Sequence, residues 1–308
     1  MATTRPTATA YAAWVAVCLL WGTTYLAIRV ALETIPPMLV GGLRWTLAGA
    51  MLLGVLAARG QRMPSVRAWP MLSVLGVLLI GFGNGGVVWA EQTLTSGLAA
   101  LLVATVPCWM IGVEWAAGTP ERLTPLRAAG LLVGFAGILL LVWPDLRFSD
   151  GAEAVGAVVA TQLACVGWAI GSTYSRRRDA GENVLVTASA QMLTGGVVML
   201  AAGTLRGEWA RLAVTPRSGG ALAYLVLFGS VAGFSAYTYA LKHLPVSTTS
   251  LYAYVNPVLA VILGIIVLGE PWSPRLAVSG MTVLVGMAMV RRHDGPPVAR
   301  DARLASGR

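Results

Sequence analysis

The chain has 308 residues, of which 56% are hydrophobic and only 11% are charged, with a formal net charge of +9 and a mean hydropathy of +0.72. Apolar runs of about 20 residues recur along it, the length that an α-helix needs to cross a bilayer, so the composition excludes an ordinary soluble globular protein. The arginines lie between these runs and not in one basic patch, which argues against a nucleic-acid partner.

Ten apolar segments are predicted to form membrane-spanning helices, so the predicted fold class is an all-α membrane protein. In chain order the segments cover about residues 11–32, 36–58, 70–91, 95–117, 125–143, 154–175, 183–204, 219–241, 246–268 and 274–291. The first segment lacks the small-residue cleavage site of a signal peptide, so it is interpreted as the first span, preceded by an N-terminal tail at residues 1–10. Residues 292–308 are polar and are expected to form a disordered cytoplasmic tail.

Lysine and arginine are unevenly distributed between the two sides of the predicted membrane. Fifteen lie in the tails and connections on the side of the N-terminus, and five lie in the connections on the other side. Because cytoplasmic loops carry the excess of basic residues, both termini are predicted to be cytoplasmic. The expected location is the inner (plasma) membrane of the cell, with the lipid bilayer as a partner.

The sequence contains an internal repeat. The stretch CLLWGTTYLAIR, from Cys18 to Arg29, returns 147 positions later as CVGWAIGSTYSR, from Cys165 to Arg176. Further along, the offset becomes 150. The matching pairs are Cys18 and Cys165, Trp21 and Trp168, Arg29 and Arg176, Gly83 and Gly233, and Pro107 and Pro257. Matches between such rare or helix-shaping residues indicate a duplicated unit.

This repeat predicts two domains of five helices each. The first repeat covers residues 11–143, a linker covers 144–153, and the second repeat covers 154–291. Five is an odd number, so the second unit enters the membrane from the opposite side. Inverted repeats around a central cavity are typical of transporters that work by alternating access, although a channel or scaffold can also be duplicated.

Aromatic residues of both repeats are candidates for the wall of the cavity. Trp14, Trp21 and Tyr25 lie on one face of the first segment at helical spacing, and Trp168 is the counterpart of Trp21. Packing between helices is the alternative interpretation. Trp21, Tyr25 and Trp168 are therefore candidate substrate contacts.

Three polar residues in apolar segments are further candidates. Asn84 lies within GFGNGG, whose glycines favour close packing of helices, and its amide needs a partner. Thr248, Tyr252 and Asn256 recur at intervals of four residues and form a polar stripe on the ninth segment. Such a stripe is costly against lipid, so it faces protein or water. Asn84, Tyr252 and Asn256 are accordingly candidate substrate contacts.

Two prolines lie inside apolar segments, Pro107 in the fourth and Pro257 in the ninth. Proline lacks an N–H group and its ring clashes with the preceding turn, so both residues are predicted to break their helices. The breaks would free carbonyl groups near Val103 and Ala253. They are tolerated where other helices or a wet cavity satisfy the backbone.

Arg44 is the charged residue that is predicted to lie deepest. It is ~12 Å from the start of the second segment and close to the middle of a ~30 Å hydrocarbon core. It needs a counter-charge such as Glu91, a cavity, or the carbonyl groups near Pro107. Arg29, Glu91 and Glu114 lie near the ends of segments, where hydration at the membrane interface is expected.

No metal, cofactor or nucleotide site is predicted. Cys18, Cys108 and Cys165 lie in apolar runs without a CxxC pair and are interpreted as buried thiols. No Walker-type GxxxxGK[ST] motif occurs, so drive by ATP is not expected. The histidines, His243 and His293, lack the clustered acids that a membrane-embedded enzyme needs.

Several motifs resemble the EamA-domain family of the drug/metabolite transporter superfamily, most closely its YedA-type exporters. The matching stretches are LLWGTTYLAIR at residues 19–29, GLRWTLAG around Arg44, GFGNGG at 81–86, AEQ at 90–92, TSGLAALLVATVP ending at Pro107, SLYAYVNPVLAVILG at 250–264 and LGE at 268–270. The resemblance extends over about residues 12–290.

The resemblance implies ten helices in two inverted EamA units around a central cavity. It also implies functional or structural importance for Trp21, Arg44, Pro107, Asn256, Pro257 and Glu270, with Glu270 capping or bracing the hairpin between the ninth and tenth helices. The second unit departs from the first where Arg44 is replaced by Gln191, so recognition of a charge would be one-sided.

The sequence therefore predicts a secondary transporter, not an enzyme, that exports small metabolites or drugs, such as amino-acid-like or aromatic solutes. A facilitative importer or an exchanger of the same fold is the alternative. A membrane-embedded enzyme or a scaffold is disfavoured, because a scaffold gives no reason for Arg44, Asn84 and the stripe at Tyr252 and Asn256.

Overall fold

The computed structural model describes residues 8–118, 124–142, 151–177, 183–244, 246–250 and 252–291. Within these ranges every regular element is a helix, which confirms the all-α class. Residues 1–7 of the predicted N-terminal tail, 144–150 of the predicted linker and the predicted tail 292–308 lie outside the described residues. Seven helices of the described part are long and apolar enough to cross a membrane: Ala8–Leu32, Pro37–Ala58, Trp69–Ala90, Ser96–Ala116, Ala152–Arg177, Val184–Leu205 and Pro216–His243.

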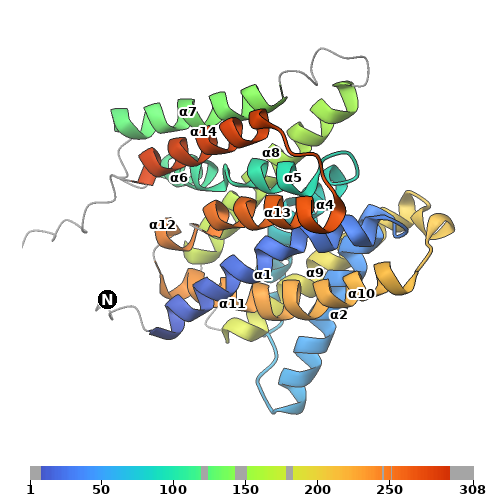
Figure 1. The fold of residues 1–308 in the computed structure, drawn as a ribbon. Coiled ribbons are helices and arrows are strands. Elements are labelled where there is room, and N and C mark those ends of the chain that lie inside the picture. The colour runs from blue at the N-terminus through green and yellow to red at the C-terminus, as the bar shows by residue number, and fades with distance from the viewer. Residues whose placement is uncertain are drawn as a thin grey trace, which may run out of the picture.

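The helices of the first half follow one another with short connections (Figure 1). Proline is the first residue of α2 and of α7, where its missing N–H costs nothing and its fixed φ suits a helix start. The elements are α1 (Ala8–Leu32), α2 (Pro37–Ala58), α3 (Trp69–Gly76), the π-helical stretch η1 (Val77–Asn84), α4 (Gly85–Ala90), α5 (Ser96–Val103), α6 (Val106–Ala116) and α7 (Pro125–Val142).

The second half is built in the same way. Its elements are α8 (Gly151–Arg177), α9 (Val184–Leu205), the short 3-10 helix η3 (Glu208–Arg211), α10 (Pro216–Tyr224), the π-helical stretch η4 (Leu225–Ala232), α11 (Gly233–His243), α12 (Val246–Thr249), α13 (Tyr252–Leu268) and α14 (Pro274–Arg291). The helices α7, α13 and α14 are shorter than the seven named above, with 18, 17 and 18 residues.

Backbone conformations recur at equivalent positions of the two halves. The π-helical stretches η1 and η4 are both eight residues long and start 148 positions apart. Gly60 and Gly207, which are 147 positions apart, follow α2 and α9 with φ values of +71° and +67°. These left-handed conformations end a helix at little cost only in glycine. The sequence repeat is therefore accompanied by a repeat of backbone geometry.

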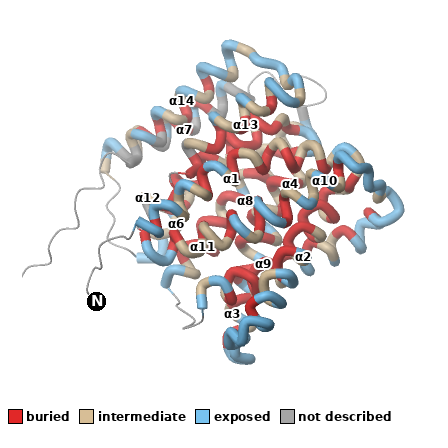
Figure 2. The backbone as a smooth tube through the Cα atoms, turned by 60° about the horizontal axis from the view of Figure 1, so that its bottom comes forward, coloured by how far each residue is buried: buried red, intermediate tan, exposed pale blue. Residues whose placement is uncertain are grey.

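Equivalent helices of the two halves pack against each other, α2 against α9 and α7 against α14 (Figure 1). The contact between α2 and α9 is close because Gly49 has no side chain: a Cβ there would lie 2.5 Å from the backbone nitrogen of Leu193. Gly196 on α9 meets the backbone of α2 at Thr46 in the same way. Figure 2 shows that the buried segments concentrate in the middle of the bundle.

The two prolines have different effects on their helices. The helical segment that contains Pro107 is interrupted at Ala104 and Thr105, between α5 and α6. The carbonyl of Leu102 at this interruption accepts hydrogen bonds from the Thr105 hydroxyl (2.7 Å) and from the Gln162 amide (3.3 Å). Pro257 instead lies inside α13. The predicted ninth segment is thus interrupted, but not at Pro257: α12 ends at Thr249 and α13 begins at Tyr252. Because α13 starts only shortly before Pro257, the proline ring meets the first turn of the helix alone.

Candidate substrate cavity

A cavity of about 60 Å³ lies between the two halves of the chain. It is lined by residues of α1, α2, η1, α4, α5, α6, α8 and α13: Trp21, Thr24, Tyr25, Ile28, Arg44, Trp45, Gly83, Asn84, Val87, Val103, Val106, Ala164, Cys165, Trp168 and Tyr252. Six of the predicted contacts are therefore brought together: Trp21, Tyr25, Arg44, Asn84, Trp168 and Tyr252. The lining is mostly apolar with a few polar groups, as in small-molecule sites generally.

Trp21 and Trp168, the counterparts in the repeat, meet at the cavity with their ring centroids 5.5 Å apart and their planes nearly perpendicular. Tyr252 lies 5.1 Å from Trp21, also edge to face. Tyr237 of α11 lies behind them, 5.0 Å from Trp21 and 5.2 Å from Trp168. Edge-to-face pairs of this kind are favoured by the ring quadrupoles, so the wall is a preformed aromatic cluster.

The polar atoms of this cluster are paired with protein groups. The Trp21 indole donates to the carbonyl of Gly229 at 3.0 Å. The Trp168 indole donates to the Tyr237 hydroxyl at 3.1 Å, and that hydroxyl also pairs with Ser172 at 2.7 Å. The cluster therefore presents ring faces and edges to the cavity while its N–H and O–H groups are held behind them.

Arg44 is 2% exposed and carries the cationic group of the cavity wall. Its Nε donates to the Ser230 hydroxyl at 2.7 Å, and its guanidinium carbon lies 4.4 Å from the Trp45 ring centroid. Its Nη1 has no hydrogen-bond partner among the described residues. The side chain is therefore oriented by protein contacts but retains donor capacity.

Trp45, whose ring contacts Arg44, is also hydrogen-bonded to Asn84. The Trp45 indole donates to Oδ1 of Asn84 at 2.7 Å. This bond links α2 to η1, and it gives the Asn84 amide oxygen the partner that a polar group in an apolar segment needs. Asn84 thus has both a structural role and a place on the cavity wall.

Asn256 is buried but is not on the cavity wall. With its amide nitrogen turned toward the neighbouring carbonyls, it donates to Cys18 and to Tyr252, each at 3.1 Å. Asn256, which the sequence predicts as a substrate contact, therefore does not line this cavity. Its amide braces α13 against α1, because α13 packs directly on α1.

Glu91 also differs from the sequence expectation, which placed it in the hydrated interface. It is 0% exposed, and neither carboxylate oxygen has a hydrogen-bond partner among the described residues. Arg29 folds over the same turn, where its Nη1 donates to the backbone carbonyl of Glu91. Glu91 and Arg44 share no hydrogen bond in this conformation. The Glu91 side chain is thus buried, whereas the next two residues of the turn, Gln92 and Thr93, are exposed.

Among the residues that contact the predicted site residues, Trp45, Ser230 and Tyr237 were not singled out from the sequence. Trp45 adjoins Arg44, which is a usable signal, because a tryptophan ring is a common partner of a buried guanidinium. Ser230 and Tyr237 come from η4 and α11, far away in the sequence. No local pattern connects them with Arg44 or Trp21.

The cavity is contracted in this conformation, which we refer to as the closed conformation. A volume of about 60 Å³ is enough for a few water molecules, whereas sites for drug-sized ligands have volumes of roughly 300–1,000 Å³. Binding of an organic solute therefore requires the surrounding helices to move apart. No group of three or more metal-binding side chains occurs in the described part of the chain.

Residues 8–143 and residues 155–292 each match the EamA-like transporter family. The chain thus belongs to the EamA-like transporter family, and its apolar helices make it a multi-pass membrane protein. It is 35% identical over 269 residues to the inner membrane transporter YedA of Escherichia coli, a match that covers 85% of this chain and 84% of YedA.

More distant relatives have the same kind of name. The chain is 22% identical over 272 residues to the transporter YvbV of Bacillus subtilis, covering 88% of each chain. A crystal structure of a protein 24% identical to this chain has a TM-score of 0.65 and covers 94% of this chain and 98% of that one. This last similarity concerns the fold alone.

Proposed function

We propose that this chain is a secondary transporter that exports a small organic solute carrying a carboxylate and an apolar or aromatic part. The observation that carries the proposal is Arg44, a buried guanidinium with an unpartnered Nη1 at a cavity walled by aromatic rings. A guanidinium binds a carboxylate through two parallel hydrogen bonds, which gives both affinity and orientation. Trp21, Trp168 and Tyr252 offer ring faces and edges to an apolar group.

The topology that we propose has ten transmembrane helices in two inverted repeats, residues 11–143 and 154–291, with a linker at 144–153. Its support is the paired packing of α2 with α9 and α7 with α14, the two π-helical stretches, and the two separate matches to one family. Both termini are cytoplasmic in this proposal, because the basic residues gather on that side. An alkaline phosphatase fusion that is active at the C-terminus would reverse the topology and the direction of transport.

Alternating access fits the closed cavity. A solute enters when the helices separate on one side, and it leaves when they separate on the other. An importer or exchanger would use the same cavity, and the direction follows from the gradients that drive it. The proposed membrane is the inner (plasma) membrane, as for YedA.

The test of the carboxylate anchor compares two probes that differ in one group, L-phenylalanine and L-phenylalaninamide. With purified protein in lipid nanodiscs, we expect L-phenylalanine to change tryptophan fluorescence at lower concentration than the amide, because only the carboxylate offers Arg44 a negative charge and two acceptor oxygens. Arg44→Gln should abolish this preference, and Arg44→Lys should reduce it, since lysine lacks the fork geometry.

Discrimination by a buried charged hydrogen bond is worth about 1.5–3 kcal/mol, which is roughly a tenfold to hundredfold difference in affinity. Thermal melting in the same nanodiscs serves as the control for folding. If both folded variants discriminate between the probes as the wild type does, Arg44 does not anchor the carboxylate. If counterflow in proteoliposomes is absent for a panel of acidic, neutral and basic solutes, the transport proposal itself fails.

A further inference from the structure

Glu91 is a carboxyl group that the aromatic cavity does not use. It follows α4 directly, at the end of the third apolar segment, and it is 0% exposed. Neither of its oxygens accepts a hydrogen bond from the described residues. A carboxylate that is removed from water without a donor is strongly destabilised in its charged form, whereas the neutral acid is not.

The charged and titratable groups around Glu91 come from three elements. They are Arg29 and Tyr25 on α1, Arg44 on α2 and Glu270 after α13. None of the three charged side chains forms a hydrogen bond with the Glu91 carboxyl group. Arg29 donates to the backbone carbonyls of Glu91 and Gln92, Arg44 donates to Ser230, and Glu270 accepts from the backbone and hydroxyl of Ser96.

The fold itself does not need an acid at this position. At the repeat offset of 150, Glu91 corresponds to Leu241, and the flanking Ala90 and Leu94 correspond to Ala240 and Leu244. All of these residues are buried in their own halves. Because leucine fills the equivalent space in the second half, packing alone does not account for a carboxyl group in the first.

We propose that Glu91 carries a proton in this closed conformation and releases it when the helices around it separate, so that solute transport is coupled to proton movement. On opening, the O–H bond of the carboxyl group breaks, the proton passes to water, and the carboxylate remains. Arg29, whose guanidinium already contacts the backbone of the same residue, then becomes its counter-ion. Each conversion between the open and closed forms moves one proton on or off the protein. Coupling to a solute rests on the proposed transport function, whereas the proton site does not.

The proton site can be tested without a substrate. Infrared difference spectroscopy of the protein in lipid nanodiscs, recorded during a titration from acidic to alkaline pH, detects the C=O stretch of protonated carboxyl groups. We expect a component of this band to persist at neutral pH in the wild type and to be lost in Glu91→Gln. The matched control is Glu153→Gln, because Glu153 is exposed in the first turn of α8. Its removal should leave the persistent component unchanged.

Absence of the band from the wild type at neutral pH, or its full persistence in Glu91→Gln, would overturn the proton site. Glutamine has the shape of the protonated acid, which is why Glu91→Gln is the first variant. If Glu91→Gln folds poorly, Glu91→Leu is used instead, because leucine occupies the equivalent position of the second half. Loss of the component in either variant supports the assignment.

Coupling is tested in proteoliposomes with radiolabelled L-phenylalanine as the probe. The ratio of uptake with a pH gradient to uptake without one should differ from unity in the wild type and return to unity in Glu91→Gln. An unchanged ratio in the variant would overturn the coupling. If the wild type moves no L-phenylalanine at all, the transport proposal fails for this solute, and the infrared result still decides the proton site.

Discussion

A single buried cation, Arg44, depends on neighbours from distant parts of the chain. Its Nε is held by Ser230, 186 positions away, and its guanidinium lies on the ring of Trp45. Hydrogen bonds to charged groups contribute about 1.5–3 kcal/mol to stability. The Ser230 hydroxyl is therefore expected to contribute to the stability of the fold through this hydrogen bond.

Ser230→Ala should lower the free energy of unfolding by about 1.5–3 kcal/mol, because it leaves Nε of a buried guanidinium without an acceptor. The matched control is Ser235→Ala, in which the lost hydroxyl is buried but has no hydrogen-bond partner among the described residues. That change should be neutral or slightly stabilising. Thermal melting of both variants in one detergent checks the prediction, and equal melting temperatures would contradict it.

At the scale of elements, the molecule is built around close crossings of helices. Glycine permits the approach of α2 to α9, because a Cβ at Gly49 would clash with the backbone of Leu193 and with the carbonyl of Ser189. In a membrane such contacts replace the hydrophobic effect, which does not drive helices together in lipid.

Gly49→Ala should therefore destabilise the protein by about 1–3 kcal/mol, since the backbone of α9 cannot move out of the way as a flexible side chain can. Gly54→Ala on the same helix is the control, because a Cβ there meets nothing within 4 Å. Alanine is the better helix former by about 1 kcal/mol, so Gly54→Ala should be neutral or stabilising. A melting curve of Gly49→Ala that matches the wild type would show that the crossing is not tight.

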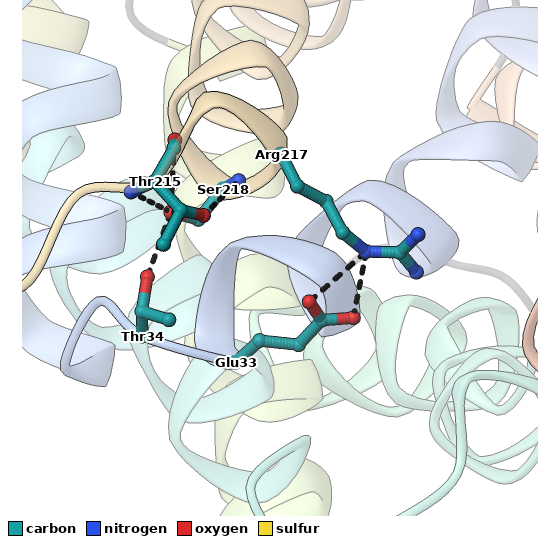
Figure 3. A network of polar contacts seen from close by, with 5 residues as sticks. All are labelled: Glu33, Thr34, Thr215, Arg217 and Ser218. Atoms are coloured by element: carbon teal, nitrogen blue, oxygen red, sulfur yellow. Dashed lines mark hydrogen bonds and ion pairs between the residues drawn. The ribbon is translucent and has the colours of Figure 1, made fainter.

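At the scale of the whole molecule, a polar network joins the two halves at the end where α1 stops and α10 begins (Figure 3). Nε of Arg217 contacts both carboxylate oxygens of Glu33, at 3.1 and 3.0 Å, and Thr34 donates to Ser218 at 2.7 Å. The backbone N–H of Ala213 adds a bond of 3.2 Å to the carbonyl of Thr34. We expect these contacts to hold the two halves together at this end.

Arg217→Ala should make the cavity easier to open from that end. With the three native cysteines replaced by alanine and a cysteine introduced at Tyr252, the rate of labelling by a water-soluble thiol reagent reports the opening. An exposed ion pair contributes up to about 1 kcal/mol, which corresponds to a rate increase of up to roughly fivefold.

Arg211→Ala is the control for this change of charge, because Arg211 lies exposed in η3 at the same end of the molecule. It should leave the labelling rate unchanged. An equal rate in the Arg217 and Arg211 variants would show that the network does not hold the cavity closed.

Much of this architecture is readable in the sequence because its causes are local. Apolar runs of helical length predict helices wherever they occur, and helical spacing placed Trp21 and Tyr25 on one face. The repeat of Trp21 at Trp168 linked two distant segments, and both tryptophans line the cavity. Depth within an apolar run was enough to single out Arg44, because a charge there needs compensation.

What the tertiary structure decided are the contacts between segments that no local pattern connects. Three such contacts depend on how the helices pack. They are the bond of Arg44 to Ser230, the bond of the Trp168 indole to Tyr237, and the bonds of Asn256 to backbone carbonyls. The burial of Glu91 is of the same kind, since its position at the end of an apolar run predicts hydration. Composition and periodicity determine which segments leave water, whereas the partners of their polar groups are determined only when those segments pack together.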